Sequence, residues 1–204
     1  MKLYYSPGAC SMSPHIVLRE AGLAFDLEQV DLKAKKTKAG ADFKAINPKG
    51  MVPVLQLDDG QVLTEGPAIV QYLADQKPEA GLAPKAGTIE RARLQEWLNF
   101  VTAELHKGFT PLFKPNTPED YKPIARETLS ERFAYLDKQL AGKQYLLGDK
   151  FTVADAYCFT VLGWSQYQNI DLSPWPNIKS YMARVAQRPK VKEAMTAEGL
   201  IKAA

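Results

Sequence analysis

The sequence is poor in the residues that bind metal ions or cross-link a chain. Its 204 residues include two cysteines, Cys10 and Cys158, and two histidines, His15 and His106. Disulfide-dependent secreted domains need more cysteines, and no Cys/His group here has the spacing of a zinc site. We therefore expect no metal, no disulfide framework, and two free thiols in a reducing compartment.

Excess charge of one sign and long apolar runs are also lacking. The 26 basic and 23 acidic residues give a formal net charge of +3, which is too small to indicate a nucleic-acid binder. No apolar run is long enough to span a bilayer, and the first residues lead into a predicted strand without a signal-peptide pattern. These features favour a cytoplasmic protein with neither nucleic acid nor membrane as a partner.

Short strands and helices alternate in the first third of the sequence. Strands are expected at residues 2–5, 25–32, 52–57 and 62–63, and helices from Ser13-Pro14 and Gly66-Pro67. A strand–helix–strand unit requires a parallel pair with a right-handed crossover, and Asp59-Gly60 predicts a closing hairpin. This order is that of an α/β thioredoxin-like domain with a small mixed sheet.

A second, all-α domain is expected beyond a stretch rich in proline, glycine and alanine. We place the first domain at residues 1–77, the linker at 78–87 and the helical domain at 88–204. From Leu94 to Leu105 the apolar residues follow helical spacing, and Thr152 to Asp155 resembles a helix capping box.

Cys10 is the most informative single residue. It lies between the first strand and the first helix, where unpaired N–H groups and the helix dipole favour a thiolate. A two-thiol redox site would have cysteine at Ser13, so a resolving thiol must come from another molecule. The alternative is a small buried thiol near a turn, and Cys158, inside an apolar run, is expected to be such a core thiol.

Two backbone segments could bind an extended ligand. Val52-Pro53 begins a strand, and with a cis bond Val52 could pair with a peptide as an added strand. Glu65-Gly66 lies at a helix start, where the Gly66 N–H suits a carboxylate and Glu65 suits an ammonium group. An ordinary strand start and an ordinary helix start are the alternatives.

Polar side chains further along allow two interpretations each. Asn99 and His106 lie seven residues apart in a predicted helix, so their face could line a cleft or meet solvent. Five lysines between Lys33 and Lys44 could place one ammonium group on an anionic ligand or could form a solvated loop.

Four segments resemble the bacterial beta-class cytosolic glutathione S-transferases. They span both halves of the chain and are residues 2–15 (KLYYSPGACSMSPH), 47–55 (NPKGMVPVL), 63–69 (LTEGPAI) and 151–156 (FTVADA). The resemblance implies the glutathione transferase fold, an enzyme that conjugates the glutathione thiolate to hydrophobic electrophiles, and a homodimer.

The resemblance also implies roles for individual residues. Cys10 and His106 would be catalytic, with Cys10 beside the glutathione sulfur and able to form a mixed disulfide with it. The residues implied to bind glutathione are Lys35, Val52, Pro53, Glu65, Gly66 and Asn99. Asp155 would cap a helix in the folding core.

The electrophile pocket is expected to be apolar and rich in aromatic side chains. Its candidate residues, which could equally be core, are Phe109, Phe113, Trp164 and Tyr167. Two other functions stay open on the residues alone, namely a non-catalytic binding or assembly module and a disulfide reductase or reductive dehalogenase acting through Cys10.

Overall fold

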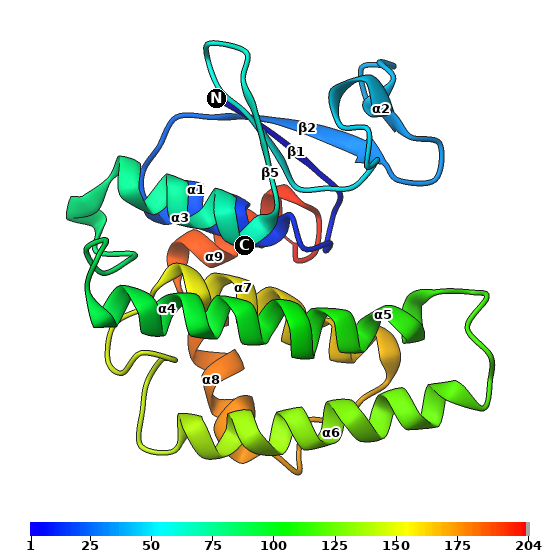
Figure 1. The fold of residues 1–204 in the computed structure, drawn as a ribbon, viewed down its shortest axis with the longest axis vertical. Coiled ribbons are helices and arrows are strands. Elements are labelled where there is room, and N and C mark those ends of the chain that lie inside the picture. Colours follow the sequence, from blue (N-terminus) through cyan, green and yellow to red (C-terminus); the bar gives the residue numbers. More distant parts are fainter. Residues whose placement is uncertain (203–204) are drawn as a thin grey trace. The chain divides into compact units, whose positions relative to one another are not determined.

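The protein divides into two compact units in the computed structural model, which describes residues 1–202 (Figure 1). The sheet unit comprises residues 1–83 and the C-terminal stretch that begins at Arg188, and the helical unit comprises residues 84–187. The sequence-based division assigned every residue from 88 onward to the helical domain. The two divisions therefore differ at the C-terminal end, where the chain returns to the sheet unit.

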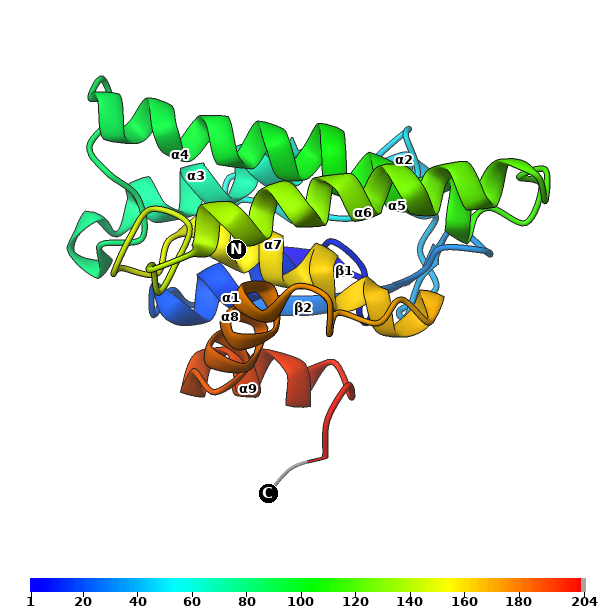
Figure 2. The ribbon, with the colours of Figure 1, turned by 90° about the horizontal axis from the view of Figure 1, so that it is seen from below.

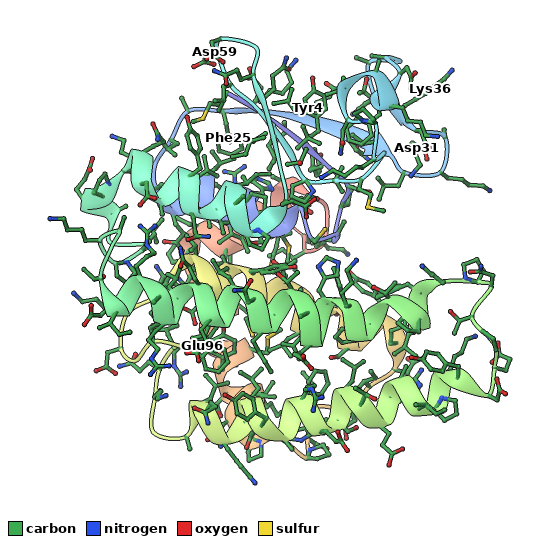
Figure 3. All side chains as sticks on the ribbon, viewed as in Figure 1. Tyr4, Phe25, Asp31, Lys36, Asp59 and Glu96 are labelled. Carbon is green, nitrogen blue, oxygen red and sulfur yellow. The ribbon has the colours of Figure 1, made fainter. Side chains whose placement is uncertain are left out.

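The sheet unit contains a mixed five-stranded sheet in the order β3-β2-β1-β4-β5. β1 pairs with β2 in parallel, and β4 pairs with β1 and β5 in the antiparallel sense. The strands are β1 (Lys2–Tyr5), β2 (Asp26–Asp31), β3 (Lys36–Thr37), β4 (Val54–Gln56) and β5 (Val62–Thr64). The predicted mixed sheet is confirmed, with Asp59 in the turn of the β4–β5 hairpin (Figure 3).

Helices α1 and α3 of this unit pack against each other, and α9 packs against α1 (Figure 1). The helices are α1 (Met12–Glu20), α2 (Phe43–Ile46), α3 (Gly66–Gln76), the short 3₁₀ helix η1 (Pro78–Ala80) and α9 (Pro189–Ala197). Two buried residues, Val191 and Ala194, attach α9 to the unit. The Arg188 guanidinium also donates two hydrogen bonds, of 2.7 and 2.8 Å, to the Glu20 carboxylate.

Helix α1 begins earlier than its proline suggested. Its N-cap residue is Ser11 rather than Ser13. The Ser11 hydroxyl caps no helical N–H, because it donates to the Ser6 carbonyl and accepts from the Ser6 N–H. These two bonds close the loop that carries Cys10 back onto the end of β1.

In the helical unit, three consecutive helical segments from Ile89 to Phe113 form one long rod, and α6 (Tyr121–Leu140) lies beside it (Figure 2). Its elements are α4 (Ile89–Phe100), the π-helix η2 (Val101–His106), α5 (Lys107–Phe113), α6 (Tyr121–Leu140), α7 (Val153–Leu162), the 3₁₀ helix η3 (Gly163–Gln168) and α8 (Pro176–Ala186). Gly108 permits the close approach of α5 to α6, because a Cβ there would lie 2.8 Å from Leu129 Cδ2.

The predicted capping box at the start of α7 is present. Thr152 is the N-cap, and its N–H donates to the Asp155 carboxylate at 2.8 Å. The same carboxylate accepts from the Leu146 N–H at 2.9 Å and from the Tyr181 hydroxyl at 3.2 Å. Asp155 therefore joins the start of α7 to the preceding loop and to α8.

Candidate functional site

The Cys10 loop is held in place by contacts within the sheet unit. The Cys10 thiol donates a hydrogen bond to the Val52 carbonyl, with 3.3 Å between sulfur and oxygen. A carbonyl oxygen only accepts, so the Cys10 thiol is the donor in this contact. Val52 precedes Pro53 through a cis peptide bond, as proposed from the sequence, and the structure therefore brings together Cys10 and the segment before β4.

A buried carboxylate fixes the other side of this loop. Glu198, just after α9, accepts from the Gly8 N–H at 2.9 Å and contacts His15 Nδ1 at 2.8 Å. His15 Nε2 in turn accepts from the Arg19 Nε–H at 2.9 Å. The side chains of His15 and Glu198 are fully buried, so the C-terminal stretch stabilises the loop two residues before Cys10.

Glu65 lies at the junction of β5 and α3 with a positive φ of 69°. A positive φ is uncommon for a residue with a side chain. It costs about 1–3 kcal/mol, and it persists only where the surrounding structure enforces it. The Glu65 carboxylate is exposed and contacts Lys49 Nζ at 2.5 Å, and Lys49 also donates to the Thr64 hydroxyl. Gly66 follows at the first position of α3.

Lys35 is the one lysine of the basic cluster that was assigned to ligand binding. Its ammonium group donates to the Gly50 carbonyl at 2.9 Å, so the side chain is directed toward the loop before Val52. Its backbone also has a positive φ, of 56°. The sheet unit thus contains five of the predicted glutathione-binding residues together with Cys10.

The remaining predicted residues belong to the helical unit. Asn99 is exposed in α4, and His106 is the last residue of the π-helix. A π-helix has i→i+5 hydrogen bonds, so the argument that a seven-residue spacing puts both side chains on one α-helical face does not apply to these two residues.

His106 lies in an aromatic cluster. Its Nδ1 is 2.6 Å from the Tyr157 hydroxyl, and its ring meets Trp164 edge-on with 4.8 Å between centroids. Trp164 also makes edge contacts with Phe109 and Phe113, at 5.8 and 5.6 Å. Three of the four residues predicted for the electrophile pocket, Phe109, Phe113 and Trp164, therefore contact one another, and Trp164 also contacts His106.

Among residues 1–202, which the structure describes, the fourth pocket candidate, Tyr167, lies outside this aromatic cluster. It is half exposed in η3, and within the described residues its ring packs against no other aromatic ring. Phe109 is fully buried and Phe113 is 47% exposed, so the four candidates differ widely in the surface that they can offer.

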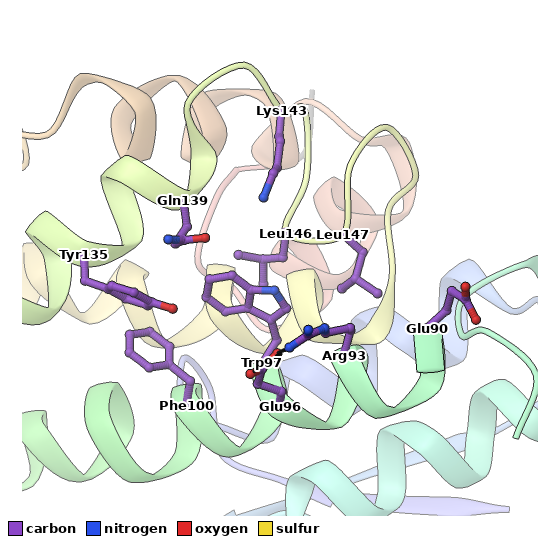
Figure 4. A pocket seen from close by; sticks show the side chains of 10 residues that line it. All are labelled: Glu90, Arg93, Glu96, Trp97, Phe100, Tyr135, Gln139, Lys143, Leu146 and Leu147. Carbon is purple, nitrogen blue, oxygen red and sulfur yellow. Dashed lines mark hydrogen bonds and ion pairs between the residues drawn. The ribbon is translucent and has the colours of Figure 1, made fainter. Parts of the chain in front are cut away.

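A separate groove of about 420 Å³ lies between α4, α6 and the following loop (Figure 4). Trp97, Phe100 and Tyr135 form one wall, with ring centroids 5.3–6.4 Å apart. Arg93 and Glu96 pair beside them. None of the predicted site residues is among its lining residues.

Sequence reasoning missed Lys49 and Tyr157, which contact the predicted residues Glu65 and His106, and Glu198, which contacts the loop before Cys10 through Gly8. Tyr157 lies in an apolar run and offered one signal, because a buried tyrosine hydroxyl usually has a hydrogen-bond partner. Glu198 had no local signal, since its partners are about 180 residues away.

The described residues contain neither a candidate membrane span nor a candidate metal site. Across residues 1–202, no helix combines the length and the apolar character needed to cross a membrane. Over the same residues, no three His, Cys, Asp or Glu side chains gather in a way that could hold a metal ion.

Comparison with known proteins identifies the family. Residues 8–76 match the model of the glutathione S-transferase N-terminal domain, and residues 100–189 match that of the C-terminal domain. The chain is 50% identical to the glutathione S-transferase GstA of Escherichia coli O157:H7 over 200 residues, which cover 98% of this chain and 100% of the relative.

Solved structures agree with this result. A beta-class glutathione S-transferase of Sphingomonas chungbukensis is 50% identical with a TM-score of 0.96. A sphingomonad glutathione S-transferase complexed with glutathione is 49% identical with a TM-score of 0.95. Each comparison covers 98% of this chain and 100% of the other. The predicted fold and enzyme class are confirmed, and this chain belongs to the glutathione S-transferase family, close to its bacterial beta class.

Proposed function

We propose that this enzyme conjugates the glutathione thiolate to small hydrophobic electrophiles through a site centred on Cys10. The contact between the Cys10 thiol and the Val52 carbonyl carries the proposal. It puts a sulfur beside a backbone segment that can pair with an extended peptide. The solved relative with bound glutathione supports the choice of peptide.

The sheet unit offers a complementary group for each end of glutathione. Val52, before Pro53, pairs with the cysteinyl backbone in this proposal. Glu65 accepts from the α-ammonium group of the γ-glutamyl end, and the Gly66 N–H at the start of α3 donates to its carboxylate. The Lys35 ammonium, already directed toward Gly50, neutralises the glycine carboxylate.

The chemistry requires the glutathione sulfur as an anion. The thiol loses its proton to solvent or a buffer base, and the thiolate forms a carbon–sulfur bond with the electrophile. A leaving group such as halide departs with the bonding electron pair, or an activated alkene takes up the pair and then a proton. We assign Asn99 and His106 to glutathione, and Phe109, Phe113, Trp164 and Tyr167 to the electrophile.

Cys10 gives the enzyme a second, redox reaction. In the proposal, the substrate is a mixed disulfide between glutathione and another thiol. The Cys10 thiolate attacks its glutathione sulfur and forms a Cys10–glutathione mixed disulfide, while the other thiol leaves as a thiolate. A second glutathione thiolate then attacks the mixed disulfide, releases oxidised glutathione and regenerates Cys10. This route needs no second cysteine in the chain, consistent with Ser13 at the position where a two-thiol site would carry one.

Conjugation and disulfide reduction are distinguished by the Cys10→Ala variant. A panel of electrophiles is incubated with glutathione, and thiol consumption is measured beside reduction of a mixed-disulfide substrate. We expect conjugation to persist in the variant and disulfide reduction to disappear. If neither activity changes, the assignment of Cys10 is wrong. If the unmodified enzyme has no activity and releases no heat on titration with glutathione, the alternative of a non-catalytic module is correct.

Two further proposals concern the state in which the enzyme works. We propose a homodimer, which family membership supports, and sedimentation as a monomer at micromolar concentration would contradict it. We also propose a cytoplasmic location, because both the thiolate and the resolving glutathione require a reducing compartment.

A further inference from the structure

The two histidines of the chain have different hydrogen-bond partners, and those partners determine which ring nitrogen carries the proton. His106 Nδ1 lies 2.6 Å from the hydroxyl of Tyr157, a residue of α7 that is 2% exposed. Both residues belong to the helical unit, so the contact depends on the packing of that unit alone.

The direction of this hydrogen bond follows from the acidity of its partners. A phenol O–H is a better donor than a neutral imidazole N–H, and an imidazole nitrogen is a better acceptor than a phenol oxygen. The short distance also suits an O–H···N bond. Tyr157 therefore donates, Nδ1 of neutral His106 carries no proton, and its Nε2 carries one.

The surrounding rings hold His106 in this orientation. Trp164 meets the imidazole edge-on at 79° and 4.8 Å, and Trp164 is itself held between Phe109 and Phe113. The backbone of His106 ends a π-helix, an irregularity that often occurs at functional sites. Rotating the ring would break the Tyr157 bond and disturb the Trp164 contact.

We propose that Tyr157 is a positioning residue, which holds His106 as the neutral Nε2–H tautomer so that His106 donates a hydrogen bond and does not act as a base. The proposal rests on the assignment of His106 to the glutathione sulfur. A fixed N–H donor stabilises the negative charge of a thiolate without having to reorganise during the reaction.

His15 provides an internal reference for the measurement. Its Nδ1 contacts the Glu198 carboxylate, which only accepts, and its Nε2 accepts from Arg19, which only donates. Neutral His15 must then be the Nδ1–H tautomer. Because the sequence has two histidines, one long-range ¹H–¹⁵N spectrum of the labelled enzyme shows both tautomers.

The first test is that spectrum of the unmodified enzyme at neutral pH, with His15→Gln used to assign the signals. We expect a protonated Nε2 and an unprotonated Nδ1 for His106, and the reverse for His15. A protonated Nδ1 in His106 overturns the proposal, and this result does not depend on the folding of any variant at Tyr157.

The second test is Tyr157→Phe, which removes the donor and keeps the ring. We expect the ¹⁵N shifts of His106 to move toward a mixture of tautomers and kcat for conjugation to fall about tenfold, with the glutathione KM changed less than about twofold. Tyr181→Phe is the matched control, since it removes a buried hydroxyl from the same unit that bonds to Asp155 instead. It should leave the His106 shifts unchanged.

The outcomes separate this proposal from the proposed function. Unchanged His106 shifts or unchanged kcat in Tyr157→Phe overturn the positioning role. An unmodified enzyme with the expected tautomers but without any turnover of glutathione contradicts the function, and the assignment of the tautomer is then correct while its catalytic role is not.

Discussion

The two units use buried charge in different ways. In the sheet unit, the Glu198 carboxylate faces a histidine and a backbone N–H, and it ties the C-terminal stretch to the Cys10 loop. In the helical unit, the Asp155 carboxylate accepts from neutral donors, namely the N–H groups of Leu146 and Thr152 and the hydroxyls of Thr152 and Tyr181. Burial raises the pKa of Asp155 to about 6, despite those hydrogen bonds. A buried carboxylate can therefore connect distant segments or cap a helix, depending on its partners.

The largest expected effect comes from removing the helical unit's buried carboxylate. Asp155→Ala leaves the N–H groups of Leu146 and Thr152 without their acceptor in the core. We expect the free energy of unfolding to fall by about 4 kcal/mol, since each unsatisfied buried donor costs about 1–3 kcal/mol. Urea titration measures the change. Asp149→Ala, an exposed carboxylate in the preceding loop, should leave the midpoint nearly unchanged.

The second effect concerns the sheet unit. Glu198→Ala removes the carboxylate that the Gly8 N–H and His15 Nδ1 contact, and we expect the free energy of unfolding to fall by about 3 kcal/mol. The freed loop should also let a thiol reagent react faster with Cys10. Glu193→Ala, which removes an exposed carboxylate from α9 itself, is the control. Equal Cys10 reactivity in the two variants would show that Glu198 does not hold the loop.

The third prediction concerns how the contribution of Asp155 to stability depends on pH. Because the pKa of Asp155 is near 6 in the folded protein and near 3.9 in an unfolded chain, the folded state holds the extra proton between these values. This contribution to stability is complete below pH 4 and is lost as the pH rises through 6, by at most about 3 kcal/mol. Asp155→Asn should flatten this part of the pH profile, and a profile identical to that of the unmodified enzyme would contradict the shift.

The smallest effect is expected on glutathione binding at the exposed side chain of Glu65. Glu65→Gln weakens the partner of the α-ammonium group, and we expect the glutathione KM to rise about tenfold. Lys49→Gln removes the neighbouring exposed ion pair and should change KM less than about threefold, since such pairs contribute little. Steady-state kinetics measures both, and the reverse order would assign the binding role to Lys49.

The sequence predicted what depends on local signals. The Val52-Pro53 motif, the hairpin at Asp59-Gly60 and the capping box at Thr152 each follow from residues close together, and all three are present. The start of α1 was placed late because Pro14 suits a first turn, whereas Ser11 is used to close the loop on Ser6.

Features set by distant contacts were not predictable. The apolar spacing from Leu94 to Leu105 fits an α-helix, and it does not reveal the π-helix that carries His106. The return of α9 to the sheet unit depends on Arg188 meeting Glu20 and on Glu198 meeting His15, pairs separated by more than 160 residues. Likewise, nothing near Tyr157 in the sequence indicates that its hydroxyl meets His106.

The most direct test of the account is to titrate the ¹⁵N-labelled enzyme with glutathione and to measure the shifts of its backbone amide signals. The account predicts saturable shifts at Cys10, Val52 and Gly66, with smaller changes over the sheet edge at β3. Saturable binding that leaves those three amides unmoved, or no binding at all, would contradict it.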